Sequence, residues 1–205
     1  MIKKLLLPMA LGALLTGNLS AATVTFAWGG VHSPNGGEFT ATTSANGVFQ
    51  TFCIEHNENI DFSSTYNYAI SGGAIQGGLS GGNPDPISLG TAYLYSQFRA
   101  GTLGGYSSGN SADQNNLQNA FWMLEGELTY DGNNVYIAAA KTALSATDAQ
   151  VQADGGGIYG VQAMNVTTLS GGIAQDQLIL VPDGGMTLAM LGMACASFGL
   201  LRRKL

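Results

Sequence analysis

Residues 38–55 read EFTATTSANGVFQTFCIE, a stretch with the pattern of a β-hairpin. Asn46 and Gly47 form one of the strongest two-residue turn signals, because both residues tolerate the positive φ that a tight hairpin turn requires. Alternating residues rich in threonine, valine and phenylalanine flank this turn and favour extended structure. The sequence therefore predicts two antiparallel strands, over 38–43 and 48–55.

The second of these strands carries a cysteine between two apolar residues. Successive side chains of a strand point to opposite faces, so Cys53 and Glu55 share one face while Phe52 lies on the other. His56 follows three residues after Cys53 and, on a regular strand, points away from it. The strand is thus expected to present a thiol and a carboxyl group on one surface.

A helix is expected over 112–127, where apolar residues recur at intervals of three and four. Ser111 and Gln114 have the spacing of a capping box at its start. The apolar stripe consists of Leu117, Ala120, Phe121 and Leu124. Further strands are predicted over 23–28, 65–70, 158–168 and 177–181, and further helices over 88–100 and 135–149. This order predicts an α+β fold with mostly antiparallel β-sheets, sandwich or barrel-like, and an inserted group of about three helices.

The N-terminal residues have the three parts of a secretory signal peptide. Two lysines open the chain, an apolar stretch covers 5–15, and small residues follow at Ser20 and Ala22. The apolar stretch is shorter than the roughly 20 residues that span a bilayer as a helix. We therefore expect residues 1–22 to be removed on export.

The C-terminus carries a turn motif, an apolar stretch and a basic cluster, in that order. The proline and glycines of the motif stop a helix from running through, so a new helix is expected over 186–201. Basic side chains after a short transmembrane helix reach the interface and tend to stay in the cytoplasm, which leaves the body of the protein outside. The motif consists of Val181, Pro182, Asp183, Gly184 and Gly185, and the cluster of Arg202, Arg203 and Lys204.

This tail resembles the PEP-CTERM class of sorting signals, specifically its Val-Pro-Asp-Gly-Gly variant. The likeness covers residues 181–205 and includes the motif, its spacing and its terminal position. It implies a Gram-negative bacterium, recognition by an exosortase-type membrane enzyme, and a place at the cell surface or in a biofilm matrix. The chain then divides into a signal peptide over 1–22, an exported domain over 23–180, and the sorting tail.

The exported part of the chain is strongly acidic. Residues 23–185 hold all 13 acidic residues but only two basic ones, Arg99 and Lys141, which gives a formal charge of −11. The charge of −6 for the whole chain hides this excess, because the other basic residues lie at the two ends. Such a body repels polyanions, so we expect no nucleic acid among its partners.

Two cysteines occur in the chain, and only one lies in the exported domain. Cys195 falls in the apolar tail and is interpreted as a small apolar residue there. Cys53 is left without an internal disulfide partner in an oxidising compartment. It should therefore be buried, paired between chains, or used chemically.

Two short segments, 65 residues apart, resemble the paired motifs of bacterial thioester domains. They are Phe52-Cys53-Ile54-Glu55 and Leu117-Gln118-Asn119-Ala120-Phe121, the latter followed by Trp122. The resemblance implies an internal bond between the Cys53 sulfur and the Gln118 side-chain carbonyl, with loss of ammonia. An amine on a surface or matrix partner could open this bond. Phe52, Glu55 and Trp122 would surround it, and Trp122, at i+4 from Gln118, would shield it from water.

Two other interpretations of these residues stay open. In a passive matrix protein Cys53 would be a small buried apolar residue, which is a common fate of free cysteine. In a secreted hydrolase it would pair with His56 or His32, although no third group orients the histidine. Cys53 and His56 lack further ligands as a metal pair. We expect no enzyme activity, no cofactor and no metal site.

Overall fold

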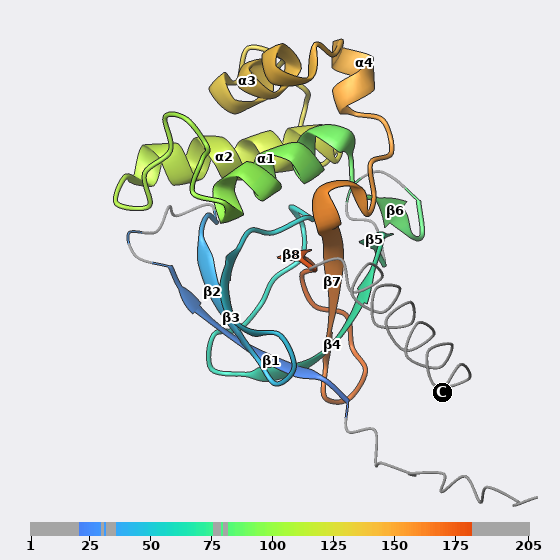
Figure 1. Ribbon diagram of the computed structural model, residues 1–205. Coiled ribbons are helices and arrows are strands. Elements are labelled where there is room, and N and C mark those ends of the chain that lie inside the picture. Colours follow the sequence, from blue (N-terminus) through green and yellow to red (C-terminus); the bar gives the residue numbers. More distant parts are fainter. Residues whose placement is uncertain (1–20, 30, 32–35, 76–78, 80–81, 182–205) are drawn as a thin grey trace, which may run out of the picture.

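A six-stranded antiparallel sheet forms the body of the computed structural model, which describes residues 21–29, 31, 36–75, 79 and 82–181 (Figure 1). The strand order is β3-β2-β1-β4-β7-β8. The strands are β1 (Thr23–Trp28), β2 (Phe39–Thr43), β3 (Gly47–Thr51), β4 (Thr65–Ser71), β7 (Val161–Thr168) and β8 (Gln177–Leu180). A small pair, β5 (Gly73–Ala74) and β6 (Asp85–Pro86), lies beside them.

The sheet curls until its two edge strands, β3 and β8, almost close a barrel. Just beyond β3, the backbone of Cys53 forms a bridge with Gln177 at the start of β8. The backbone N–H of Leu178 donates to the carbonyl of Phe52 at 3.0 Å, and that of Ile54 donates to the carbonyl of Asp176 at 3.0 Å. These bonds satisfy backbone groups that an open edge would leave unpaired. We refer to this junction, 52–54 against 176–178, as the seam.

Every second side chain along the strands points inward, and these side chains fill the interior of the barrel. On β1, Val24 and Phe26 are buried while Thr25 is exposed, as expected for a strand with one face in a core. Side chains from the other strands and from the β7–β8 connection complete this interior: Ala41, Phe49, Tyr66, Tyr68, Met164, Val166, Ala174 and Ile179.

The helices cover one end of the barrel (Figure 1). They are α1 (Leu89–Arg99), α2 (Ser111–Leu124), α3 (Val135–Leu144) and α4 (Asp148–Val151), followed by a short 3₁₀ turn, η1 (Ile158–Gly160). A second core lies between the helices and the sheet, and Phe52 and Ile54 extend into it from the end of the hairpin. The predicted α+β class with a mostly antiparallel, barrel-like sheet is confirmed.

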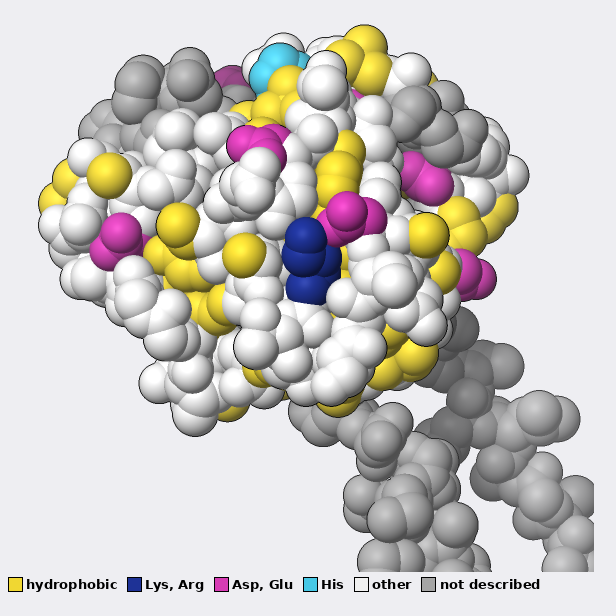
Figure 2. All heavy atoms as spheres, turned by 90° about the horizontal axis from the view of Figure 1, so that it is seen from above, with side chains coloured by type: hydrophobic (Ala, Val, Ile, Leu, Met, Phe, Trp, Pro, Cys, Tyr) yellow, Lys and Arg dark blue, Asp and Glu magenta, His cyan; other side chains and the backbone are white. Residues whose placement is uncertain are grey.

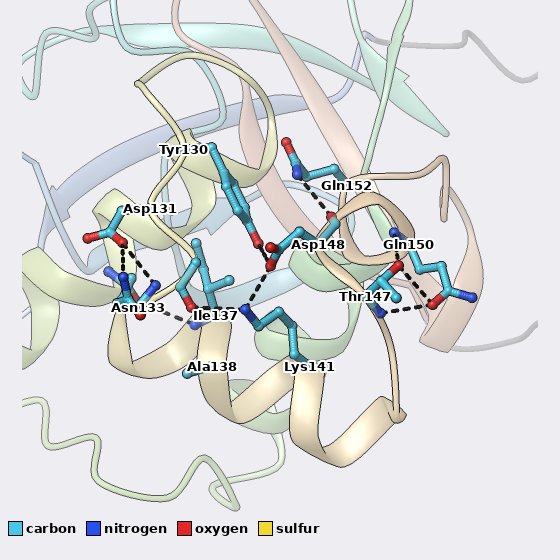
Figure 3. A network of polar contacts seen from close by, with 12 residues as sticks. Tyr130, Asp131, Asn133, Ile137, Ala138, Lys141, Thr147, Asp148, Gln150 and Gln152 are labelled. Carbon is cyan, nitrogen blue, oxygen red and sulfur yellow. Dashed lines mark hydrogen bonds and ion pairs between the residues drawn. The ribbon is translucent and has the colours of Figure 1, made fainter.

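The predicted helix over 135–149 is in fact two helices. Ser145 ends α3 in the left-handed conformation, with φ of 51°. The chain turns a corner between α3 and α4, and Figure 3 shows the polar network there. Lys141 Nζ lies 2.7 Å from Asp148 Oδ1, and the hydroxyl of Tyr130 donates to the same oxygen at 2.8 Å. Thr147 and Gln150 then form the capping box that starts α4.

The predicted strand over 48–55 is also too long. Its pairing with β2 ends at Thr51, opposite Phe39. The four residues after Thr51 are all buried, so the alternation of inward and outward faces is lost. The physical reason is the seam, because Cys53 leaves β2 and pairs with Gln177 instead.

Several predictions fall on parts of the chain outside the described residues. These are nearly all of the signal peptide over 1–22, the motif after Val181, the helix over 186–201 and the basic cluster. Among the described residues, no helix has the length and apolar character needed to cross a membrane. Figure 2, which looks onto the helices, shows scattered acidic side chains and basic side chains in one small area.

Candidate functional site

The structure brings Cys53 and Gln118 together at the seam. Helix α2 places Gln118 against the bridge, and both residues are buried, with 1% and 0% of their surface exposed. The backbone N–H of Cys53 donates to Gln118 Oε1 at 3.1 Å. In return, Gln118 Nε2 donates to the backbone carbonyl of Cys53 at 2.9 Å. The main chain of Cys53 thus holds the carboxamide of Gln118 by both of its polar atoms.

The two hydrogen bonds have a consequence for any attack of the thiol on the carboxamide. Attack would place negative charge on Gln118 Oε1, which already accepts a backbone N–H. The nitrogen that would leave as ammonia is held by the carbonyl of Cys53. A carboxamide is a poor acceptor, so a fixed geometry and a high effective concentration are what a reaction at this bond requires.

Helix α2 is positioned by its cap and by its apolar face. Asn110 is the N-cap, and its side chain accepts the N–H of Ala112 at 2.9 Å. The predicted capping box is therefore wrong, because Ser111 is the first residue of the helix rather than its cap. Gln114 is buried and donates to the carbonyl of Ser108 at 2.7 Å. Leu117 packs into the second core beside Gln118.

The thiol of Cys53 lies in an environment that favours its neutral form. Burial raises the pKa of the Cys53 thiol well above its usual range, and Glu55 raises it further wherever that carboxyl group is ionised. The side chain of Gln177 opposes this shift, because its Nε2 lies 3.6 Å from the sulfur as a hydrogen-bond donor. Gln177 is itself fully buried.

Trp122 lies beside Cys53. It is 3% exposed and forms a small apolar cluster with Cys53 and Phe39. The chain before β2 closes over this cluster at Gly36, whose φ is 113°. A Cβ at Gly36 would lie 3.2 Å from the Trp122 ring and 3.4 Å from Cγ of Gln118, so only glycine fits this approach without displacement.

A hollow of about 310 Å³ opens beside Trp122, and Cys53 forms part of its wall. His56 also lines it, with its ring centroid 4.5 Å from that of Trp122. The expectation that His56 points away from Cys53 assumed a regular strand, and the strand ends before it. The remaining wall is mainly aromatic and polar: Trp28, Gly36, Phe39, Glu58, Asn59, Ile60, Phe62 and Gln175.

Glu55 is 1% exposed and lies against the start of β8. Its Oε2 accepts the backbone N–H of Asp176 at 2.9 Å, while its Oε1 has no hydrogen-bond partner. Asp176 accepts two backbone N–H groups, from Val166 at 2.7 Å and Ile75 at 2.9 Å. Burial, followed by the charge of Asp176, raises the pKa of Glu55, so Glu55 is the partner that keeps a proton. Burial also raises the pKa of Glu58 to about 7.

Phe52 lies on the other side of the chain from the sulfur, as the alternation predicted. It is fully buried among the helices and packs against Phe98 and Phe121, with ring centroids at 5.0 and 5.2 Å. This packing fixes the position of the chain directly before Cys53.

Three residues of this site were not predicted from the sequence: Gly36, Asp176 and Gln177. A run of polar residues, Gln175-Asp176-Gln177, directly before an apolar strand is the signal that could have drawn attention to two of them. Their closeness to Cys53 depends on closure of the barrel, which local patterns do not encode. Among the described residues, no group of three or more histidine, cysteine or acidic side chains could hold a metal ion.

Comparison of the chain with models of protein families, with curated proteins and with solved structures finds no match. The function proposed below therefore rests on the geometry of Cys53 and Gln118 and on the motifs at the chain ends.

Proposed function

We propose that this chain is an exported bacterial surface or matrix protein that attaches covalently to a partner through an internal Cys53–Gln118 thioester. The observation that carries the proposal is the pair of reciprocal hydrogen bonds between the Cys53 main chain and the Gln118 carboxamide. They join a lone exported cysteine to the one glutamine that the motif pattern selects. The burial of both residues supports a bond that persists in water.

The chemistry needs no cofactor. When the bond forms, the Cys53 sulfur attacks the Gln118 side-chain carbon, the carbon–nitrogen bond breaks, and the thiol proton leaves with ammonia. When a primary amine opens it, nitrogen attacks the same carbon, the carbon–sulfur bond breaks, and a proton from the amine passes to the sulfur. The product is an amide between Gln118 and the partner, with a free thiol on Cys53.

The intact mass of the freshly purified protein tests this reaction. We expect a deficit of one ammonia and no titratable thiol, without any disulfide. Methylamine should release the thiol and add one methylamine, and peptide mapping should find it on Gln118. Cys53→Ala and Gln118→Ala should each abolish the deficit, whereas Asn116→Ala, at an exposed position of the same helix, should keep it. A full mass with a titratable Cys53, or methylamine on Gln177, would overturn the pairing.

The sorting tail implies a second prediction. We expect residues 1–22 to be absent from mature protein, and the segment 186–204 to be removed in a host with an active exosortase. The basis for this prediction is the proline–glycine break directly before a short apolar stretch and a basic cluster. Peptide mapping of envelope protein from such a host checks this. Mature protein that still carries 186–204 would instead be anchored in the membrane by its C-terminal helix.

The second candidate is a passive matrix protein of the same surface class. Its supporting observation is the tight burial of Cys53, which by itself also suits an unreactive side chain. A secreted hydrolase is the third, supported by the place of His56 beside the same hollow. Catalysis lost with Cys53→Ala but kept with Gln118→Ala would indicate the hydrolase.

A further inference from the structure

We propose that Gln177 is a catalytic residue of the thioester, whose side-chain N–H stabilises negative charge on the Cys53 sulfur. This inference rests on the proposed Cys53–Gln118 bond. Gln177 Nε2 lies 3.6 Å from the sulfur and also donates to the carbonyl of Gln175 at 3.3 Å. Gln177 therefore touches a reacting atom from the side of β8, while Gln118 approaches from α2.

The seam holds Gln177 in place independently of Gln118. The backbone bridge between Cys53 and Gln177 is flanked by hydrogen bonds of 3.0 Å on both sides, from Leu178 to Phe52 and from Ile54 to Asp176. A donor fixed in this way needs little reorganisation when charge develops on the sulfur, which is the property that makes such donors effective.

A buried carboxamide at this position lowers the stability of the fold, so its presence calls for a functional reason. Gln177 is fully buried, and its Oε1 has no hydrogen-bond partner. An unsatisfied buried acceptor destabilises a protein, and an apolar side chain of similar size would avoid that loss. The hydrogen bond that Nε2 donates to the sulfur is a function that an apolar side chain could not perform.

The sulfur needs such a donor because its surroundings oppose a charge. Burial disfavours the thiolate, whereas the Gln177 N–H favours it. The sulfur carries this charge twice, once as the attacking nucleophile and once as the leaving group. Gln177 keeps both of its amide protons throughout, because the protons of each step leave with ammonia or pass from the amine to the sulfur.

The test compares full-length wild type with Gln177→Met, which keeps a side chain of similar length without a donor. We expect the bond to form and to open with methylamine about ten- to hundredfold more slowly, as for loss of one hydrogen bond to a charged group. In the opened protein, the pKa of the Cys53 thiol, followed by thiolate absorbance, should be higher than in wild type. Gln162→Met, at a partly buried glutamine on strand β7, should change neither quantity.

Each outcome decides between the two proposals. Wild-type rates and an unchanged thiol pKa in Gln177→Met would overturn the role of Gln177 and leave the thioester standing. Absence of the ammonia deficit in wild type would overturn both. If Gln177→Met does not fold, Gln177→Asn replaces it, because its carboxamide is one methylene shorter and should fall short of the sulfur. Wild-type kinetics in the Gln177→Asn variant would again reject the inference.

Discussion

Trp122 packs in one apolar cluster with Cys53 and Phe39 and is almost fully buried, which makes it the candidate shield of the proposed bond. We expect Trp122→Ala to form the thioester but to lose it to hydrolysis faster than wild type, because water then reaches the carbonyl carbon. Trp122→Phe, which keeps an aromatic ring, should give an intermediate rate.

Mass spectrometry over time measures this loss as a return from the ammonia deficit to a glutamate at position 118. Removal of a buried tryptophan also costs about 3–5 kcal/mol of stability, so the fold of each variant is checked first. Equal hydrolysis rates in folded Trp122→Ala and wild type would show that the ring is not the shield.

Among single residues, those in or next to the two motifs could be selected from the sequence, whereas neighbours from distant segments could not. Cys53 and Gln118 stand in short local patterns, and the structure brings them together. Gln177 and Gly36 belong to no such pattern, because each reaches the site through contacts between segments far apart in the chain.

Among the elements, helix α2 positions Gln118, and the N-cap of this helix stabilises its first turn. Asn110→Ala should lower the free energy of unfolding by about 1 kcal/mol, because the N–H of Ala112 loses its acceptor. Ser111→Ala is the matched control and should be close to neutral, since Ser111 is exposed and lies inside the helix. Chemical denaturation measures both. A larger loss for Ser111→Ala would favour the capping box that the sequence pattern suggested.

The elements themselves were largely predictable, and their ends were not. An Asn-Gly turn and an apolar stripe are local signals, so the hairpin and α2 appear where the sequence predicted them. The end of β3 at Thr51 and the break of α3 at Ser145 arise from pairing with β8 and from the corner at Asp148. Such long-range contacts override local preference.

For the whole molecule, buried carboxyl groups make stability depend on pH. Burial raises the pKa of Glu125 to about 7 in the folded protein, although Ser88 donates to it at 2.8 Å. A raised folded pKa means that the folded state binds the proton more tightly than the unfolded chain does. The stability from this group is therefore complete below the unfolded pKa and is lost as pH rises through about 7.

We expect the free energy of unfolding to fall between about pH 5 and pH 7, by up to about 1.4 kcal/mol per pH unit for each such proton. Glu125→Gln keeps an acceptor for Ser88 without the titration, so its slope should be smaller than that of wild type. Denaturation at several pH values measures this. An identical slope in wild type and Glu125→Gln would remove Glu125 from the explanation.

The strand order has a mechanical consequence for the proposed attachment. A partner bound at Gln118 and an anchor beyond Val181 would load only the chain between them, which leaves the hairpin and β1 outside the path of force. Within that path, β7 is held to β4 by a ladder of six residue pairs, from Tyr66–Thr168 to Ser71–Ala163. Tension would act first on β8, the last strand before Val181, which four residue pairs hold to β7 and the bridge to Cys53 holds at the seam.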